Sequence, residues 1–247
     1  IVAETADGAK VTLNAGAVIL ATGGYASNAE MMSRYSDFMP QVVTSVPAGN
    51  VGDGVVMATA IGAKEFDSEG LQLVYVSFTC GVGINEESGL IVTASGERVV
   101  DEWTYQSHVA MALARAKSPV GYYIAAANDP NPTVQYGMTL DSTVKAASVE
   151  ELAEELSMDP ATLRATVDRY NELCAAGKDE DFGKPAEYMI PVEGDTYYAI
   201  SMNPTTSVTF GGLSINGDSE VLDTNDQPIP GLYAAGEVAF TGLFGTE

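Results

Sequence analysis

Residues 228–237 read PIPGLYAAGE, and this stretch decides the fold that we expect. The two prolines end one element, and the short apolar run from Leu232 to Ala235 then predicts a buried strand. Small residues follow at the carboxyl end of that strand, where an open α/β sheet holds its ligands. Gly236 has no Cβ, so a flat cofactor could approach the backbone closely, and Glu237 offers two acceptor oxygens to sugar hydroxyls. The alternative is an ordinary strand with a glycine turn and a solvent-exposed Glu237.

Two further stretches share this design. Residues 15–24, AGAVILATGG, form an apolar run that predicts a second buried strand. That run ends in four small residues, Ala21, Thr22, Gly23 and Gly24. Residues 50–54, NVGDG, open a helical pattern that places Gly52 and Asp53 at the start of a helix. Each stretch is weak evidence alone, and the three together are more specific.

Taken together, the three stretches resemble the late cofactor-contacting segments of FAD-dependent oxidoreductases. Their order and spacing are similar to those of the branch that contains soluble fumarate reductase, urocanate reductase and 3-ketosteroid dehydrogenase, and the likeness extends over nearly the whole chain. The resemblance implies FAD as the cofactor, with Asp53 and Glu237 binding its hydroxyl groups and glycines allowing close approach. The residues that would contact FAD are Ala21, Thr22, Gly23, Gly24, Gly52, Asp53, Gly211, Gly212, Gly236 and Glu237.

One part of such a site does not occur in the sequence. The pyrophosphate of FAD needs a Gly-x-Gly-x-x-Gly turn between a strand and a helix, and the resemblance places that turn before Ile1. Residues 1–5 read as the middle of a strand, and residues 244–247 stop directly after a glycine turn. We therefore expect a fragment of a longer chain that binds FAD weakly on its own.

Composition narrows the class of protein. The 247 residues carry a net charge of −23, which argues against nucleic acid as a partner because nucleic-acid binders use basic patches. No apolar run reaches the roughly 18–20 residues that span a bilayer, so we expect a soluble protein, in a compartment that the sequence leaves open. A metal site is not expected, because His108 is the only histidine and the two cysteines lie far apart.

The fold that we expect is α/β with an α+β insertion: a partial Rossmann-like FAD-binding domain interrupted by a capping domain. The expected FAD-binding parts are residues 1–66 and 205–247, and the expected cap is residues 67–204. Periodicity and turn signals predict strands at 17–21, 71–79, 89–92, 95–100, 121–128, 197–200 and 208–215, and hairpins at 1–14 and around 221–226. Helices are expected at 28–35, 53–63, 107–116 and 148–156, and from 159 onward.

The resemblance also indicates where the substrate is protonated or deprotonated. Residues 96–102, GERVVDE, match the motif that precedes the proton-handling residue of the family. Fumarate-reducing members carry an arginine four positions after the Glu of this motif, and here that position is Gln106. Gln106 can donate a hydrogen bond but has no useful pKa for proton donation. Tyr105 is our first choice for the proton role and His108 the second, because ketosteroid-type members use a tyrosine in this vicinity. A cap-surface tyrosine and an ordinary helix histidine are the alternatives.

A second departure concerns the substrate. Dicarboxylate reducers carry a histidine directly before the Thr-x-Gly-Gly element, and here Val208 precedes residues 209–212, TFGG. An apolar pocket suits a neutral, bulky substrate, and its expected lining is Tyr75, Phe78, Val208 and Phe210, although each of these could equally be ordinary core. We therefore expect a small-molecule substrate with an activated C=C bond that is not a dicarboxylate, and an unknown redox partner.

Three functions stay open at this point. The first is an FAD-dependent ene-reductase or dehydrogenase that moves a hydride between flavin and an activated C=C bond. The second is a fumarate- or urocanate-type reductase whose substrate arginine lies outside residues 1–247. The third is a catalytically inactive, flavoprotein-like binding module, which Gln106 favours.

Overall fold

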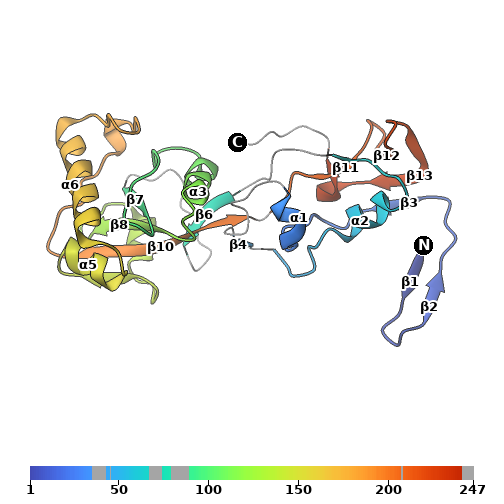
Figure 1. The fold of residues 1–247 in the computed structure, drawn as a ribbon, viewed down its shortest axis with the longest axis horizontal. Helices are drawn as coiled ribbons and strands as arrows, with labels where there is room; N and C mark the ends of the chain where they lie inside the picture. Colours follow the sequence, from blue (N-terminus) through green and yellow to red (C-terminus); the bar gives the residue numbers. More distant parts are fainter. Residues whose placement is uncertain (35–42, 45, 67–73, 79–88, 207, 241–247) are drawn as a thin grey trace. The chain divides into compact units, whose positions relative to one another are not determined.

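The computed structural model describes residues 1–34, 43–44, 46–66, 74–78, 89–206 and 208–240, and it divides into two compact units (Figure 1). Of the described residues, unit 1 contains 1–34, 46–66 and 208–240, and unit 2 contains 43–44, 74–78 and 89–206. Each unit mixes helices with sheets, so the α/β character of the expected fold is present in both. Among the described residues, no helix has the length and apolarity to cross a membrane.

Unit 1 is built on a three-stranded sheet with the order β12 (Glu220–Leu222), β13 (Pro228–Ala234), β3 (Val18–Leu20). Strands β13 and β3 are parallel, with Leu232 opposite Val18 and Ala234 opposite Leu20. The turn between β12 and β13 is the hairpin expected around residues 221–226. This sheet places the carboxyl ends of β3 and β13 side by side.

The expectation that the two prolines end an element is wrong, because both lie inside β13. Proline lacks the N–H that a strand needs on a paired side. Pairing with β3 begins only at Leu232, so Pro228 and Pro230 precede the part of β13 that pairs with β3. A proline at these positions therefore removes no hydrogen bond between β13 and β3.

Unit 1 also contains a second sheet, short helices and an exposed hairpin. A second sheet has the order β14 (Ala239–Phe240), β11 (Gly212–Ser214), β5 (Glu65–Phe66), and β1 (Val2–Glu4) pairs with β2 (Lys10–Thr12) in a hairpin. The expected strand 208–215 is therefore only three residues long. Helix α1 (Ala29–Ser33) is capped by the Asn28 side chain, and α2 (Asp53–Thr59) begins after Gly52.

Unit 2 is organised around the ten-residue strand β10 (Tyr197–Thr206). Strand β10 pairs with β8 (Gly121–Ala126), β9 (Val144–Ala146), β6 (Val74–Phe78) and β4 (Val43–Thr44), and β8 also pairs with β7 (Leu90–Thr93). The sequence predicted a strand only at 197–200. Pro204 continues the strand because β8 pairing stops at Met202 and β4 pairing starts at Thr205.

Helices cover this sheet and close the core of unit 2. They are α3 (Gln106–Arg115), α4 (Pro132–Gly137), α5 (Val149–Glu155) and α6 (Pro160–Ala176), and Figure 1 shows α5 and α6 next to the β8 and β10 end of the sheet. The predicted stripe of α6 is buried, and its members are Leu163, Val167, Tyr170 and Leu173. Three of these side chains, Leu163, Val167 and Tyr170, pack with residues of β7, β8 and α5 in one apolar cluster.

The predicted strand at 95–100 does not form. It is reduced to an isolated bridge between Val92 and Arg98. Residues 94–96 form a turn instead, in which the Gly96 amide donates to the Thr93 carbonyl at 3.0 Å. Arg98 and Glu102 form buried ion pairs with Asp179 and Lys184, and no local pattern predicts these partners because they lie about eighty residues further along the chain.

Candidate functional site

The candidate site in unit 1 lies where β3 and β13 end. The parallel pairing continues past Ala234, since the Ala235 amide donates to the Leu20 carbonyl at 2.9 Å. The segments that follow the two strands, residues 21–24 and 235–237, therefore leave the sheet at the same edge. This is the edge at which an open α/β sheet binds ligands.

Glu237 joins three segments of unit 1 through its carboxylate. Its Oε1 accepts hydrogen bonds from the Thr209 amide at 2.6 Å and from the Thr209 hydroxyl at 2.9 Å. Its Oε2 lies 3.5 Å from Nδ2 of Asn50, a longer contact. Asn50 in turn accepts from the Ala26 amide through its Oδ1 at 2.8 Å. Oε2 is thus held loosely and keeps acceptor capacity for a hydroxyl group.

Gly24 is needed because this network leaves no room for a side chain. A Cβ at Gly24 would lie 2.0 Å from Oγ1 of Thr209 and 2.2 Å from Oε1 of Glu237. A Cβ at Gly52 would lie 2.5 Å from Sδ of Met31. The Gly52 amide also donates to the Gly24 carbonyl at 3.0 Å, which connects the second and third glycine stretches directly.

Gly23 and Gly236 differ from Gly24, because their φ angles are +74° and +77°. A side chain at either position would be strained. Among the described residues, no heavy atom lies within 4 Å of the place where a Cβ of Gly236 would be, so they leave open space beside that backbone. A flat ligand that carries hydroxyl groups fits this space. It would lie against the unshielded backbone and beside a carboxylate that has spare acceptor capacity.

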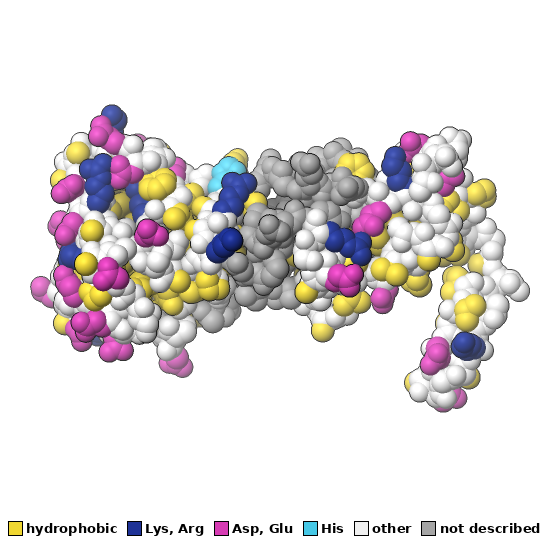
Figure 2. All heavy atoms as spheres, in the orientation of Figure 1, with side chains coloured by type: hydrophobic (Ala, Val, Ile, Leu, Met, Phe, Trp, Pro, Cys, Tyr) yellow, Lys and Arg dark blue, Asp and Glu magenta, His cyan; other side chains and the backbone are white. Residues whose placement is uncertain are grey.

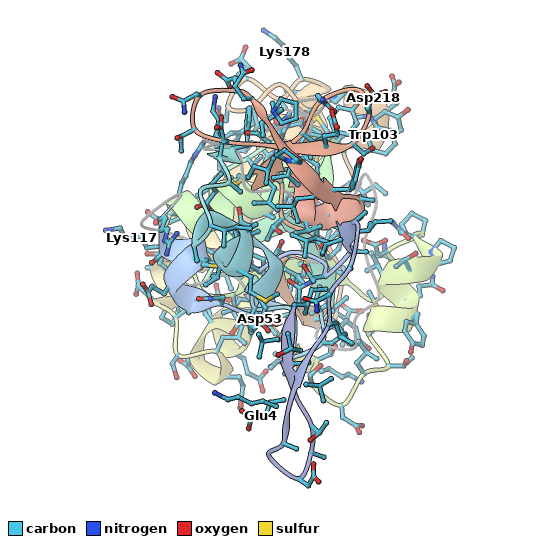
Figure 3. The ribbon with its side chains drawn as sticks, turned by 90° about the vertical axis from the view of Figure 1, so that its right-hand side faces the viewer. Glu4, Asp53, Trp103, Lys117, Lys178 and Asp218 are labelled. Atoms are coloured by element: carbon cyan, nitrogen blue, oxygen red, sulfur yellow. The ribbon has the colours of Figure 1, made fainter. Side chains whose placement is uncertain are left out.

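The remaining predicted cofactor residues divide into exposed and buried ones. Asp53 is exposed on the first turn of α2 (labelled in Figure 3), and Ala21 and Thr22 are exposed after β3. Gly211 and Gly212 are buried, and a Cβ at Gly212 would lie 2.6 Å from the Val238 carbonyl oxygen. The absence of a side chain at Gly212 therefore serves backbone packing within unit 1.

Sequence reasoning missed the roles of Asn50 and Thr209. Both lie inside the motifs that were singled out, NVGDG and TFGG, but attention fell on their glycines and on Asp53. Their polar side chains next to glycine turns were the available signal. The structure shows that both side chains contact Glu237, so the stretches 50–54 and 228–237 meet at its carboxylate. The stretch 15–24 joins them at Gly24, which packs against Glu237 and accepts from the Gly52 amide.

Comparison with known proteins gives the family. The model of the FAD binding domain family matches residues 1–247. The chain belongs to the FAD binding domain family. It is 33% identical to a urocanate reductase of Eggerthella lenta over 96% of this chain and 42% of the relative, and 29% identical to a vinyl phenol reductase of Lactiplantibacillus plantarum over 94% of this chain and 55% of the relative.

A solved structure agrees with this assignment. It is the open conformation of a flavocytochrome c3 fumarate reductase, which matches this chain with a TM-score of 0.75 and 32% identity. The match covers 91% of this chain and 41% of the fumarate reductase chain. The chain thus spans about half or less of the length of these relatives. The expected resemblance to FAD-dependent oxidoreductases of this branch is confirmed, and FAD is the cofactor of the family.

The candidate proton-handling residues lie in unit 2, at the start of α3. Tyr105 precedes the first residue of the helix and its side chain is 66% exposed. His108 is also exposed and is the cyan side chain in Figure 2. Its Nδ1 lies 3.0 Å from the Thr104 hydroxyl, and its ring meets the Tyr105 ring edge-on at 5.9 Å. The structure therefore brings Tyr105 and His108 together. The side chain of Gln106 lies outside the described residues.

The predicted substrate-lining residues are described only in part. Val208 is 37% exposed and Phe210 is half-buried, so neither is fully enclosed core. The side chains of Tyr75 and Phe78 lie outside the described residues. Among the residues that the structure describes, no group of three or more His, Cys, Asp or Glu side chains could hold a metal ion.

Proposed function

We propose that this chain is part of an FAD-dependent oxidoreductase that moves a hydride between flavin and an activated C=C bond of a small molecule. When bound, FAD supplies the hydride chemistry. The observation that carries the proposal is the meeting of three glycine stretches at one place. Asn50 contacts Glu237, the Gly52 amide donates to the Gly24 carbonyl, and Gly24 packs directly against the Glu237 carboxylate. In this proposal unit 1 is the FAD-binding domain, approximately residues 1–66 and 205–247, and unit 2 is the capping domain, approximately residues 67–204.

The residues of unit 1 have distinct roles in this proposal. Glu237 and Asp53 accept hydrogen bonds from FAD hydroxyls. Gly23 and Gly236 let the cofactor approach the backbone. Gly24 leaves space for the network that fixes Glu237, and Gly52 leaves space for the side chains of Met31 and Tyr25. The exposed residues Ala21 and Thr22 complete the contact surface, whereas the buried residues Gly211 and Gly212 lie in the packing of unit 1.

In unit 2, Tyr105 transfers the proton to or from the substrate, and Gln106 donates a hydrogen bond. His108 is the second choice for the proton role. Exposure of Tyr105 and its contact with His108 support this assignment, because an unshielded phenol can meet a substrate. The proton-transfer group must come within hydrogen-bond reach of the reacting carbon.

The substrate is proposed to be a neutral molecule rather than a dicarboxylate, since Val208 replaces the histidine of dicarboxylate reducers. A relative named vinyl phenol reductase supports this choice. A fumarate- or urocanate-type activity is the second candidate, because the urocanate reductase of Eggerthella lenta is 33% identical to this chain. The third, an inactive binding module, is favoured by Gln106 alone.

Flavin binding tests the role of Glu237. In the full-length protein, Glu237→Gln removes the negative charge, and loss of charge-assisted hydrogen bonds should weaken FAD binding about 10- to 100-fold. Titration of the apoprotein with FAD, followed by flavin fluorescence, measures this. Glu4→Gln, an exposed position in the β1–β2 hairpin, is the matched control. Equal affinity for FAD in both variants would contradict the proposed site.

Turnover tests the substrate and the proton role. We expect the full-length protein to reduce or form C=C bonds in neutral enones or vinyl arenes in preference to fumarate or urocanate. Tyr105→Phe should lower kcat about 100- to 10,000-fold, while Tyr136→Phe, at another exposed tyrosine of unit 2, should not change it. Normal turnover by Tyr105→Phe would remove Tyr105 from the mechanism, and a protein that binds no flavin would favour the inactive module.

A further inference from the structure

Four charged side chains form a buried cluster in unit 2, and we call it the buried quartet. Its members are Arg98, Glu102, Asp179 and Lys184. Their side chains are between 0% and 6% exposed, and the two cations balance the two carboxylates. Buried charges are costly unless they are paired and hydrogen-bonded, so this cluster needs a reason beyond packing.

Glu102 is the centre of the buried quartet. Its carboxylate accepts from Nε and Nη2 of Arg98 at 2.9 and 2.8 Å, a two-point pair. It also accepts from Nζ of Lys184 at 3.2 Å and from the Ile91 amide at 3.1 Å. Four donors from three different segments therefore fix one side chain in position and orientation.

The other members hold these donors in place. Asp179 accepts from Nη2 of Arg98 at 2.8 Å and from the Lys184 amide at 3.1 Å. Nζ of Lys184 also donates to the Gly89 carbonyl at 2.6 Å. The Arg98 guanidinium lies 5.1 Å from the centre of the Tyr170 ring and 4.9 Å from that of Phe182. The arrangement leaves Glu102 little freedom to move.

Glu102 is followed by a short turn that leads directly into α3. The Trp103 amide donates to Oδ1 of Asp101 at 2.8 Å, and the Trp103 ring stacks on Tyr188 with 3.3 Å between ring centres. Thr104 contacts His108, and Tyr105 is the N-terminal flanking residue of the helix. The turn is thus fixed at Glu102 and Trp103, directly before the two candidate proton-handling residues.

Stability alone does not account for the buried quartet. Buried ion pairs often contribute little net stability compared with well-packed apolar side chains, because desolvation offsets the attraction. The four hydrogen bonds to the Glu102 carboxylate instead fix its position and orientation. We propose that the buried quartet is a positioning device, which fixes Glu102 and thereby the turn that presents Tyr105 and His108. The catalytic consequence rests on the proposed function, but the positioning itself does not.

The chain carries two built-in reporters for a test that needs neither cofactor nor substrate. Trp103 is the only tryptophan and His108 is the only histidine. Glu102→Gln keeps the shape of the side chain but turns one acceptor oxygen into a donor that faces Arg98 or Lys184. We expect increased quenching of Trp103 fluorescence by acrylamide and a shifted ¹H resonance of His108, with a cooperative thermal transition retained.

Two further variants complete this experiment. Asp179→Asn should shift both signals in the same direction but less, because it loosens Arg98 and leaves Glu102 intact. Lys178→Met, at an exposed lysine that pairs with Glu180, is the matched control and should shift neither. A folded Glu102→Gln chain with unchanged signals would overturn the proposal. Signals that move equally in the Lys178→Met control would also overturn it. Loss of folding in both Glu102→Gln and Asp179→Asn would overturn it too, since the buried quartet would then stabilise unit 2 as a whole.

Turnover of the full-length flavoprotein separates this inference from the proposed function. A small displacement of a catalytic group can cost about 100-fold in rate, so Glu102→Gln should lower kcat by about that factor with little change in KM. If both reporters move and kcat does not, the quartet positions the turn as inferred. In that case the proposed catalytic role of Tyr105 and His108 is what fails.

Discussion

Single atoms decide the geometry of the candidate FAD site, and Gly24 is the clearest case. The Glu237 carboxylate and the Thr209 hydroxyl both occupy the space beside its Cα. Neither group could move away from an added methyl group without breaking the hydrogen bond between Glu237 and Thr209. The absence of a side chain at Gly24 is therefore a requirement of the network and not only of a cofactor.

The first prediction concerns this position. Gly24→Ala should destabilise unit 1 by about 1–3 kcal/mol, because the new methyl group overlaps Thr209 and Glu237. Urea unfolding followed by circular dichroism measures the loss. Gly217→Ala is the control, since nothing lies within 4 Å of a Cβ there. Equal stability of the two variants would show that the Glu237 network is not formed as described.

The sequence identified the segments that meet at the candidate site but not the hydrogen bonds between them. The glycine stretches were predicted to converge, and Gly24, Gly52 and Glu237 are indeed connected. The contacts of Asn50 and Thr209 with Glu237 could not be derived, because they join residues 187 and 28 positions apart. Hydrogen bonds across such separations depend on the final packing and leave no local pattern in the sequence.

Helix starts were predictable because their signals are local. Ser148 and Asp159 each accept a hydrogen bond from an amide of the first turn of their helix, at the positions from which these helices were expected. Asn28 does the same for α1. Strand ends were less predictable. Pro228 and Pro230 lie within β13, because pairing with the distant strand β3 begins only at Leu232. Residues 95–100 form a turn and a single bridge in place of the predicted strand.

The second prediction tests one of these caps. The Ser148 hydroxyl accepts from the Glu151 amide at 3.1 Å, and Oε2 of Glu151 accepts from the Ala147 amide at 2.9 Å. Ser148→Ala should destabilise unit 2 by about 1 kcal/mol, because the first turn of α5 loses its cap. Thermal melting provides the measurement, with Ser142→Ala at a nearby exposed serine as the control. A melting temperature equal to that of the control would argue against the cap.

We expect the stability of the whole molecule in acid to depend on its charged side chains. The chain has 34 acidic and 11 basic residues, and acidic side chains are spread over the surface in Figure 2. Within unit 2, burial opposes ionisation of Asp179, but hydrogen bonds from Arg98 and from the Lys184 and Phe182 amides lower its pKa to about 2. Burial lowers the pKa of Lys184, against the attraction of Glu102.

The third prediction follows from the sign of the Asp179 shift. Its pKa in the folded chain lies below the ordinary value of 3.8, so its ionised form stabilises unit 2 fully above about pH 4. This contribution is lost as the pH falls through about 2. The difference in free energy of unfolding between the natural chain and Asp179→Asn should therefore shrink over that range.

Urea unfolding at several pH values measures this difference. Asp141→Asn, at an exposed aspartate of unit 2, is the control and should show no comparable change. A difference between the natural chain and Asp179→Asn that stays constant from about pH 5 to about pH 2 would contradict the stated role of Asp179.

Strand β10 has a consequence for how the chain is made. It pairs with β4, β6, β8 and β9, all of which precede it in the sequence. As the polypeptide leaves the ribosome, those four strands emerge before the partner that joins them. Their unpaired edges stay open to neighbouring molecules until residues 197–206 are synthesised. A nascent chain halted before Tyr197 should therefore recruit chaperones more strongly than one released after Thr206.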